Sequence, residues 1–208
     1  MNAVMYQSAG QGRRRQWWAG GLALMVTLVG CGGGDNTINP LSNPSTVSNP
    51  VSTGGQKLSF VYFQRCINDI LQAQLASLQG SGTNSCAGSG CHDSVNGTGG
   101  ALRVVQGAVA VDLADPGNSA AVIRTSDMYK NYYSAQGVTV VGSASQSRLL
   151  NKPMLLVQHA GGQIFASLSD VNAARIAYWI NHPQGQDEFS SAASMFTPQN
   201  SDTGECNQ

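Results

Sequence analysis

The most constraining feature of the chain is a pair of cysteines with a histidine directly after the second. Cys86 and Cys91 enclose four residues, and His92 follows at once. Cysteines followed by a histidine in this way are typical of covalent haem attachment, in which both thiols become thioethers and the histidine ligates the iron. The usual spacing encloses about two residues. The wider spacing needs an outward bulge, which Gly88 and Gly90 permit because glycine adopts backbone angles that are closed to other residues.

The first part of the chain, residues 1–30, has the pattern of an export signal. Three basic residues, Arg13–Arg15, precede an apolar run, Ala19–Gly30, which is shorter than the roughly 20 residues of a membrane-spanning helix. The run ends in small residues directly before Cys31, which resembles the lipobox of bacterial lipoproteins. We therefore expect residues 1–30 to be removed and Cys31 to carry lipid, including palmitate, that anchors the protein to the membrane. Gly32 follows in place of an aspartate, which indicates the outer membrane, with the domain facing the periplasm.

Residues 31–56 predict a flexible tether between the lipid and the folded domain. They are rich in Gly, Asn, Ser, Thr and Pro, and such a segment cannot bury enough apolar surface to offset its ordering entropy. The whole chain has 11 basic and 11 acidic residues, so loss of the three leader arginines gives a net charge of −3 with neutral histidines. This balance leaves no basic excess for nucleic acid, which we therefore exclude as a partner.

Hydrophobic periodicity predicts one mostly α-helical domain over residues 57–190, with short strands and long loops. A polar, extended tail is expected over residues 191–208. The expected elements are a helix from Leu58 that stops before Gly80, a hairpin around Gly107, a helix through Ser119–Tyr133 that Asp115 caps, a strand at Val138–Val141, a helical turn at Ser145–Leu150, and a helix that Ser169 caps and Pro183 ends.

The five cysteines can be assigned in two ways. If Cys31 carries lipid and both cysteines of the haem motif form thioethers, Cys66 and Cys206 remain, and two exported thiols most simply form a disulfide. In the alternative assignment Cys86 and Cys91 pair with each other and no haem is present. Both assignments balance the cysteine count. A zinc site is disfavoured because the motif lacks a fourth ligand.

Four residues are candidates for the sixth iron ligand. We select His159, because Gly161 and Gly162 beside it would let the backbone approach a flat macrocycle closely. Met154 is the alternative, and its thioether would raise the reduction potential relative to two histidines. Met128 lies on an expected helix and is expected to pack in the core, and His182 precedes a helix-ending proline, where capping is expected.

Four segments occur in an order that resembles a known family: Cys86–His92, Gly99–Arg103, Ser147–Leu150 and Tyr178–Ile180. The chain is similar, over roughly residues 60–183, to the single-haem c-type cytochrome domains of bacterial periplasmic and surface proteins. The resemblance implies a small cytochrome c-like helical fold around one haem c. The chain differs from the family in its wider cysteine spacing and in lacking the distal methionine-proline segment.

These observations predict an electron carrier, not an enzyme, that exchanges electrons with redox partner proteins in the cell envelope. Tyr129, Tyr132, Tyr133 and Trp179 could line the haem or pack in the core. The alternative function is a disulfide-stabilised lipoprotein without a cofactor that acts as a binding or assembly module. A haem enzyme such as a peroxidase would need an open distal site. The sequence contains no Ser-His-Asp, phosphate-loop or paired-carboxylate pattern.

Overall fold

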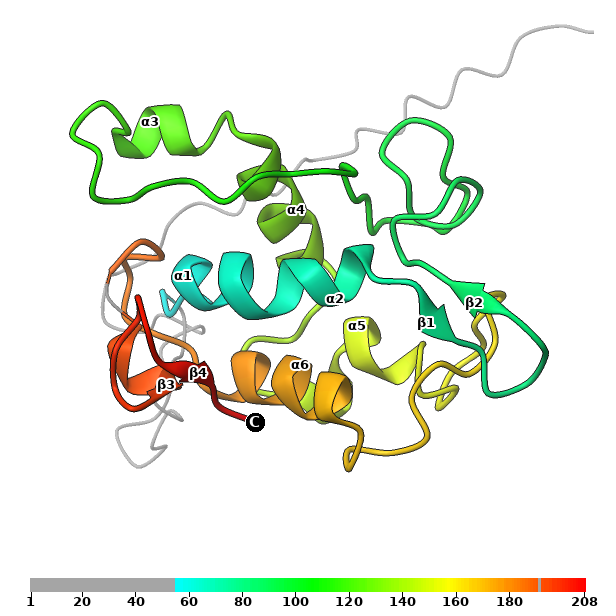
Figure 1. Cartoon of the computed structure of the whole chain (residues 1–208). Coiled ribbons are helices and arrows are strands. Elements are labelled where there is room, and N and C mark those ends of the chain that lie inside the picture. Colours follow the sequence, from blue (N-terminus) through cyan, green and yellow to red (C-terminus); the bar gives the residue numbers. More distant parts are fainter. Residues whose placement is uncertain (1–54, 191) are drawn as a thin grey trace, which may run out of the picture. The chain divides into compact units, whose positions relative to one another are not determined.

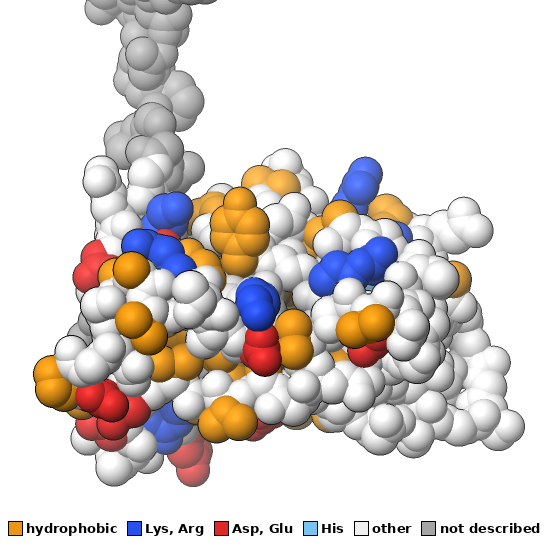
Figure 2. Space-filling view, turned by 90° about the horizontal axis from the view of Figure 1, so that it is seen from above, with side chains coloured by type: hydrophobic (Ala, Val, Ile, Leu, Met, Phe, Trp, Pro, Cys, Tyr) orange, Lys and Arg blue, Asp and Glu red, His pale blue; other side chains and the backbone are white. Residues whose placement is uncertain are grey.

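The computed structural model describes residues 55–190 and 192–208, which belong to one contact unit (Figure 1). The expected signal peptide, the lipidated Cys31 and all but the end of the expected tether lie outside these described residues. Among the described residues no helix is both long enough and apolar enough to cross a membrane. Basic and acidic side chains are interspersed with hydrophobic ones on the face drawn in Figure 2.

The domain begins with one helical run made of α1 (Phe60–Tyr62), a π-helical turn (Phe63–Ile67) and α2 (Asn68–Gln72). Ser59 caps it, since its hydroxyl accepts a hydrogen bond from the Tyr62 amide at 3.1 Å. The helix stops before Gly80, as predicted, but it already ends at Gln72.

The helix ends early because later residues occupy its last carbonyl groups. The Ala87 amide donates to the Leu71 carbonyl at 2.9 Å, and the Ser85 hydroxyl donates to the Gln72 carbonyl at 3.1 Å. The chain then forms a short antiparallel hairpin of β1 (Leu75–Ala76) and β2 (Thr83–Asn84). The end of the helix is therefore fixed by the loop that carries the cysteines.

The middle of the chain holds two helices where the sequence predicts one, because two serines act as caps. Ser119 caps α3 (Ala120–Ile123), and Ser126 caps α4 (Asp127–Gln136) through a 3.1 Å bond from the Tyr129 amide. The predicted Asp115 cap is therefore wrong. Neither the hairpin around Gly107 nor the strand at residues 138–141 forms; these segments contribute only isolated bridges at Val104 and Val140.

Two further helices complete the helical part. The predicted helical turn is a 3₁₀ turn (Ala144–Gln146) followed by α5 (Arg148–Asn151). The last helix, α6 (Val171–Asn181), is capped one residue later than predicted, by the Asp170 carboxylate, which accepts from two amides at 2.9 and 3.1 Å. The expectation of a mostly helical domain with short strands therefore holds in the described residues.

The core is built from aromatic side chains where the first helical run meets α4 and α6. The rings of Phe63 and Trp179 are 5.4 Å apart, and the Trp179 indole donates to the Ser59 carbonyl at 2.9 Å. The Tyr132 hydroxyl donates to the Leu58 carbonyl at 2.7 Å. Tyr129 packs on Phe60 and Phe189, and Tyr133 is exposed. Of the two roles left open for these aromatic residues, the structure gives core packing to Tyr129, Tyr132 and Trp179, whereas Tyr133 has neither role.

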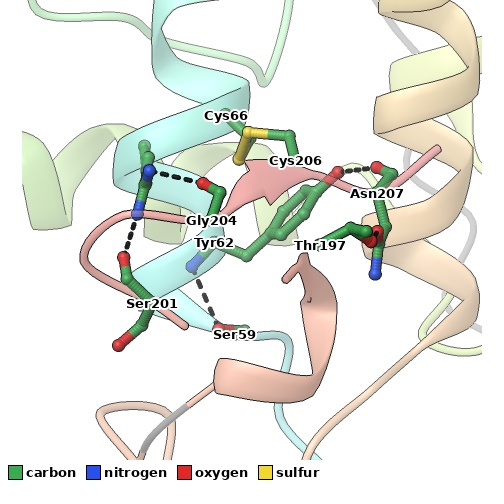
Figure 3. Close-up of a disulfide and its surroundings, with 9 residues drawn as sticks. Ser59, Tyr62, Cys66, Thr197, Ser201, Gly204, Cys206 and Asn207 are labelled. Carbon is green, nitrogen blue, oxygen red and sulfur yellow. Dashed lines mark hydrogen bonds between the residues drawn. A yellow bond between two sulfur atoms is a disulfide. The ribbon is translucent and has the colours of Figure 1, made fainter. Parts of the chain in front are cut away.

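The C-terminal segment is folded, which corrects the prediction of a polar, extended tail. After a 3₁₀ turn (Ala193–Met195), β3 (Phe196–Thr197) pairs with β4 (Glu205–Cys206) in an antiparallel ribbon. Cys206 forms a disulfide with Cys66 of the first helical run, the predicted pairing, with a Cα–Cα distance of 6.1 Å. Figure 3 shows Tyr62 donating a hydrogen bond to the Asn207 carbonyl beside it. Met195 and Phe196 are buried, and this explains why the segment folds.

Candidate functional site

The loop after β2 holds His92 in place through backbone hydrogen bonds on both sides. The His92 amide donates to the Cys86 carbonyl at 2.9 Å, and the Val104 amide donates to the His92 carbonyl at 2.7 Å. Gly99 lies against the imidazole, because a Cβ at that position would be only 2.5 Å from its Nδ1 atom. Nδ1 lies 3.2 Å from the Leu102 carbonyl oxygen. The ring is thus buried in one fixed orientation.

A tight turn between α5 and α6 holds the second histidine, His159. The Gly162 amide donates to the His159 carbonyl at 3.0 Å, and the His159 Nδ1 atom lies 2.8 Å from the Gly162 carbonyl oxygen. Gly162 has a φ of +73°, which glycine adopts without strain. The turn is attached to the β1–β2 hairpin, since the Leu78 amide donates to the Gln163 carbonyl at 2.9 Å.

The two imidazoles face the same space. Their ring centroids are 6.5 Å apart and their planes differ by 13°. A carbonyl oxygen can only accept, so Nδ1 of each ring carries the hydrogen and Nε2 is left as a free electron-pair donor. Metal-to-imidazole bonds are about 2 Å long, so two histidines on opposite sides of one metal have ring centroids a little over 6 Å apart. The observed separation of 6.5 Å is close to that value.

A cavity of about 510 Å³ lies between the histidines and is lined by Cys86, Cys91, His92 and His159. Its volume is in the range of small-molecule and cofactor sites, roughly 300–1,000 Å³. A smaller adjoining cavity of about 140 Å³ shares both histidines and Cys86. Its walls are mostly apolar, formed by Ile70, Leu71, Leu102, Val138, Leu149, Pro153, Phe165 and Ile176.

The electrostatics of the cavity favour neutral ligating groups. Burial lowers the pKa of His92, the hydrogen bond to the Leu102 carbonyl opposes this, and electrostatic interactions with His159, Lys152 and Arg103 lower the pKa further. The imidazole is therefore neutral near pH 7, as iron ligation requires. Burial raises the pKa of Cys86 to about 11, with a smaller contribution from Cys91. The Cys86 thiol therefore stays protonated at neutral pH.

The other candidate ligands lie elsewhere. Met154 packs against the hydrophobic core and does not line either cavity, and Met128 is 2% exposed within that core. His182 stacks on Tyr178 with ring centroids 3.9 Å apart, and its Nδ1 atom lies 2.8 Å from the Tyr178 carbonyl oxygen. Of the four candidates for the sixth position, only His159 lies opposite His92.

The structure shows neither a Cys86–Cys91 disulfide nor a metal-ion site built from the described residues. Cys86 and Cys91 carry free thiols and are not bonded to each other. No three His, Cys, Asp or Glu side chains converge as a metal-ion site within residues 55–190 and 192–208. The two cysteines and two histidines therefore line a cavity and do not converge on a single metal-ion position.

Several lining residues were not identified from the sequence. Phe165 and Ile176 form apolar walls, and the cations Arg148 and Lys152 lie at the cavity beside His159. One sequence signal could have revealed the two cations. They are four residues apart at a predicted helical turn, a spacing that places both on the same side of a helix.

Comparison of the chain with protein-family models, with curated proteins and with solved structures finds no match.

Proposed function

We propose that the protein is an electron carrier of the bacterial cell envelope that holds one covalently attached haem c between His92 and His159. One observation carries the proposal: two nearly parallel imidazoles, 6.5 Å apart and each with a free Nε2 atom, face a cavity that two free thiols also line. The residues fit a haem because they supply two axial nitrogen donors, two thiols and apolar walls.

Each side chain has a distinct task in this proposal. The thiols of Cys86 and Cys91 would each add across a vinyl group: a sulfur–carbon bond would form, the vinyl π bond would be lost, and the thiol proton would move to the other carbon. This addition needs no external oxidant or reductant. His92 and His159 would hold the iron, and the apolar walls would exclude water. When bound, the haem supplies one-electron redox chemistry.

Two histidines at the iron favour electron transfer over a haem enzyme, because they leave no open position for a substrate. A haem with two histidines also has a lower reduction potential than one with histidine and methionine. The proposed fold is cytochrome c-like. Its support is the order of the parts: the attachment loop follows the first helical run, and α6 packs back on that run through Trp179 and Phe63.

The proposed location follows from the N-terminal sequence. Lipid on Cys31 would anchor the protein to the membrane, at the outer membrane, with the domain facing the periplasm and the tether leaving it free to meet redox partner proteins. This part rests on sequence alone.

Production in a host with a c-type maturation system tests the proposal. The denatured protein should keep its haem on electrophoresis and show a reduced α-band, because thioethers survive denaturation. Cys86→Ala with Cys91→Ala should abolish covalent haem, whereas Cys66→Ala with Cys206→Ala should not, since that pair is already used in a disulfide. A colourless protein with the mass of the bare chain would contradict the proposal and favour a cofactor-free binding or assembly module.

A further inference from the structure

Two cations lie at the apolar cavity and form no ion pair with a carboxylate of the described residues. Arg148 is the first residue of α5, and Lys152 directly follows that helix; both line the smaller cavity together with the two histidines. The ion pairs of the described residues involve Lys57, Arg124 and Lys130, and neither cavity cation takes part in one. Two like charges four residues apart on a helical turn repel each other.

The positions of these cations indicate where the negatively charged groups of a ligand would lie. Cys91 lines only the larger cavity and Arg148 lines only the smaller one, while both cavities share His92 and His159. The Cys91 thiol and the Arg148 guanidinium group therefore line different parts of this space, whereas Cys86 and Lys152 line both cavities. A ligand that fills both cavities would meet the Cys91 thiol in the larger one and the Arg148 guanidinium group in the smaller one.

We infer that Arg148 and Lys152 bind the two propionate carboxylates of the haem and so fix which edge of the macrocycle faces α5. The inference rests on the proposed function and adds the residues that orient the cofactor. In haem, the propionates lie on the edge away from the vinyl groups, and Cys91 and Arg148 likewise line different cavities. Arginine can bind one carboxylate through two parallel hydrogen bonds, and lysine acts on the other as a point charge.

The test compares two ligands that differ only in charge. The full-length chain with Cys86→Ala and Cys91→Ala, solubilised in detergent, is titrated with haemin and with haem dimethyl ester, whose propionates carry no charge. The parent should bind haemin more tightly than the ester. Because each exposed ion pair contributes up to about a fivefold change in affinity, Arg148→Gln with Lys152→Gln should weaken haemin binding roughly tenfold and leave ester binding unchanged.

Lys130→Gln serves as the matched control, because Lys130 pairs with Asp127 and does not line either cavity. It should leave both affinities unchanged. Unchanged ester binding by the double variant also shows that it is folded. Equal affinity of the parent for the two ligands, or an equal loss for both in the double variant, would overturn the inference.

The proposed function is judged separately, from covalent haem in the unsubstituted chain produced with maturation factors. A haem-bearing protein whose thiol-free form shows no charge preference therefore refutes the propionate assignment alone. A protein that never acquires haem refutes both.

Discussion

Gly99 is the residue on which the position of His92 depends most directly. A Cβ there would come within 2.5 Å of Nδ1 and 2.6 Å of Cε1 of the imidazole. We expect Gly99→Ala to displace the ring and destabilise the protein by about 1–3 kcal/mol, as overpacking does. Urea unfolding and the low-spin haem spectrum measure the two effects. Gly80→Ala is the control, because a Cβ at Gly80 meets nothing within 4 Å. Equal stability of the two variants would contradict the role of Gly99.

Alanine substitutions distinguish His159 from Met154 as the proposed sixth iron ligand. His159→Ala should open the iron to carbon monoxide in the reduced protein, because the imidazole opposite His92 is lost. Met154→Ala should bind no more carbon monoxide than the parent, since Met154 lies in neither cavity. Absorption spectra under carbon monoxide make the measurement. Carbon monoxide binding by the Met154 variant alone would identify the methionine as the ligand, and ready binding by the parent would favour a haem enzyme.

Single residues of the site were largely predictable, whereas the residues that hold them were not. Cys86, Cys91, His92 and His159 follow from motif spacing and from glycines near a histidine, and the structure places all four at one cavity. Their roles at an iron stay predictions. The Leu102 carbonyl, which orients the His92 ring, carries no signal because every residue has a carbonyl group.

The elements show where local sequence patterns fail. The first helix ends at Gln72 because residues of the following loop donate to its last carbonyl groups, and no periodicity within the helix encodes that contact. The break between α3 and α4 was encoded locally, by a second serine, but the hydrophobic pattern continues through it. The C-terminal segment folds because it bonds to distant residues such as Cys66 and Tyr62. Its polar composition gives no sign of these contacts.

The disulfide is the element-scale feature with the clearest energetic consequence. It joins residues 140 positions apart and attaches the β3–β4 ribbon to the first helical run. Cys66→Ser and Cys206→Ser should each lower the free energy of unfolding by about 2–5 kcal/mol. The double variant should be no less stable than either single one, because both lose the same bond. Chemical denaturation measures this, and additive losses would contradict a shared bond.

At the scale of the whole molecule, the membrane anchor should be separable from the domain. Cys31→Ser should abolish palmitate labelling and detergent partitioning, because it removes the thiol predicted to carry lipid. The domain should fold and take up haem as before, since its core lies between Leu58 and Phe196. Metabolic labelling and the haem spectrum measure the two properties. Unchanged labelling would refute lipidation at this cysteine, and loss of haem uptake would contradict the independence of the domain.

The two histidines are held by different numbers of backbone bonds, and this bears on how long each proposed iron bond would last. His92 is held by its own loop, with bonds to Cys86, Leu102 and Val104, beside the covalent attachment points. His159 lies on a glycine turn whose link to the β1–β2 hairpin includes one backbone bond, from Leu78. The segment after this turn is also bonded to the end of the α5 region, since the Ile164 and Phe165 amides donate to the Pro153 carbonyl at 2.8 and 3.1 Å. If the proposed haem is bound, exchange of a diatomic ligand on the His159 side would therefore require local opening at both the hairpin and Pro153, while the His92 side stays in place.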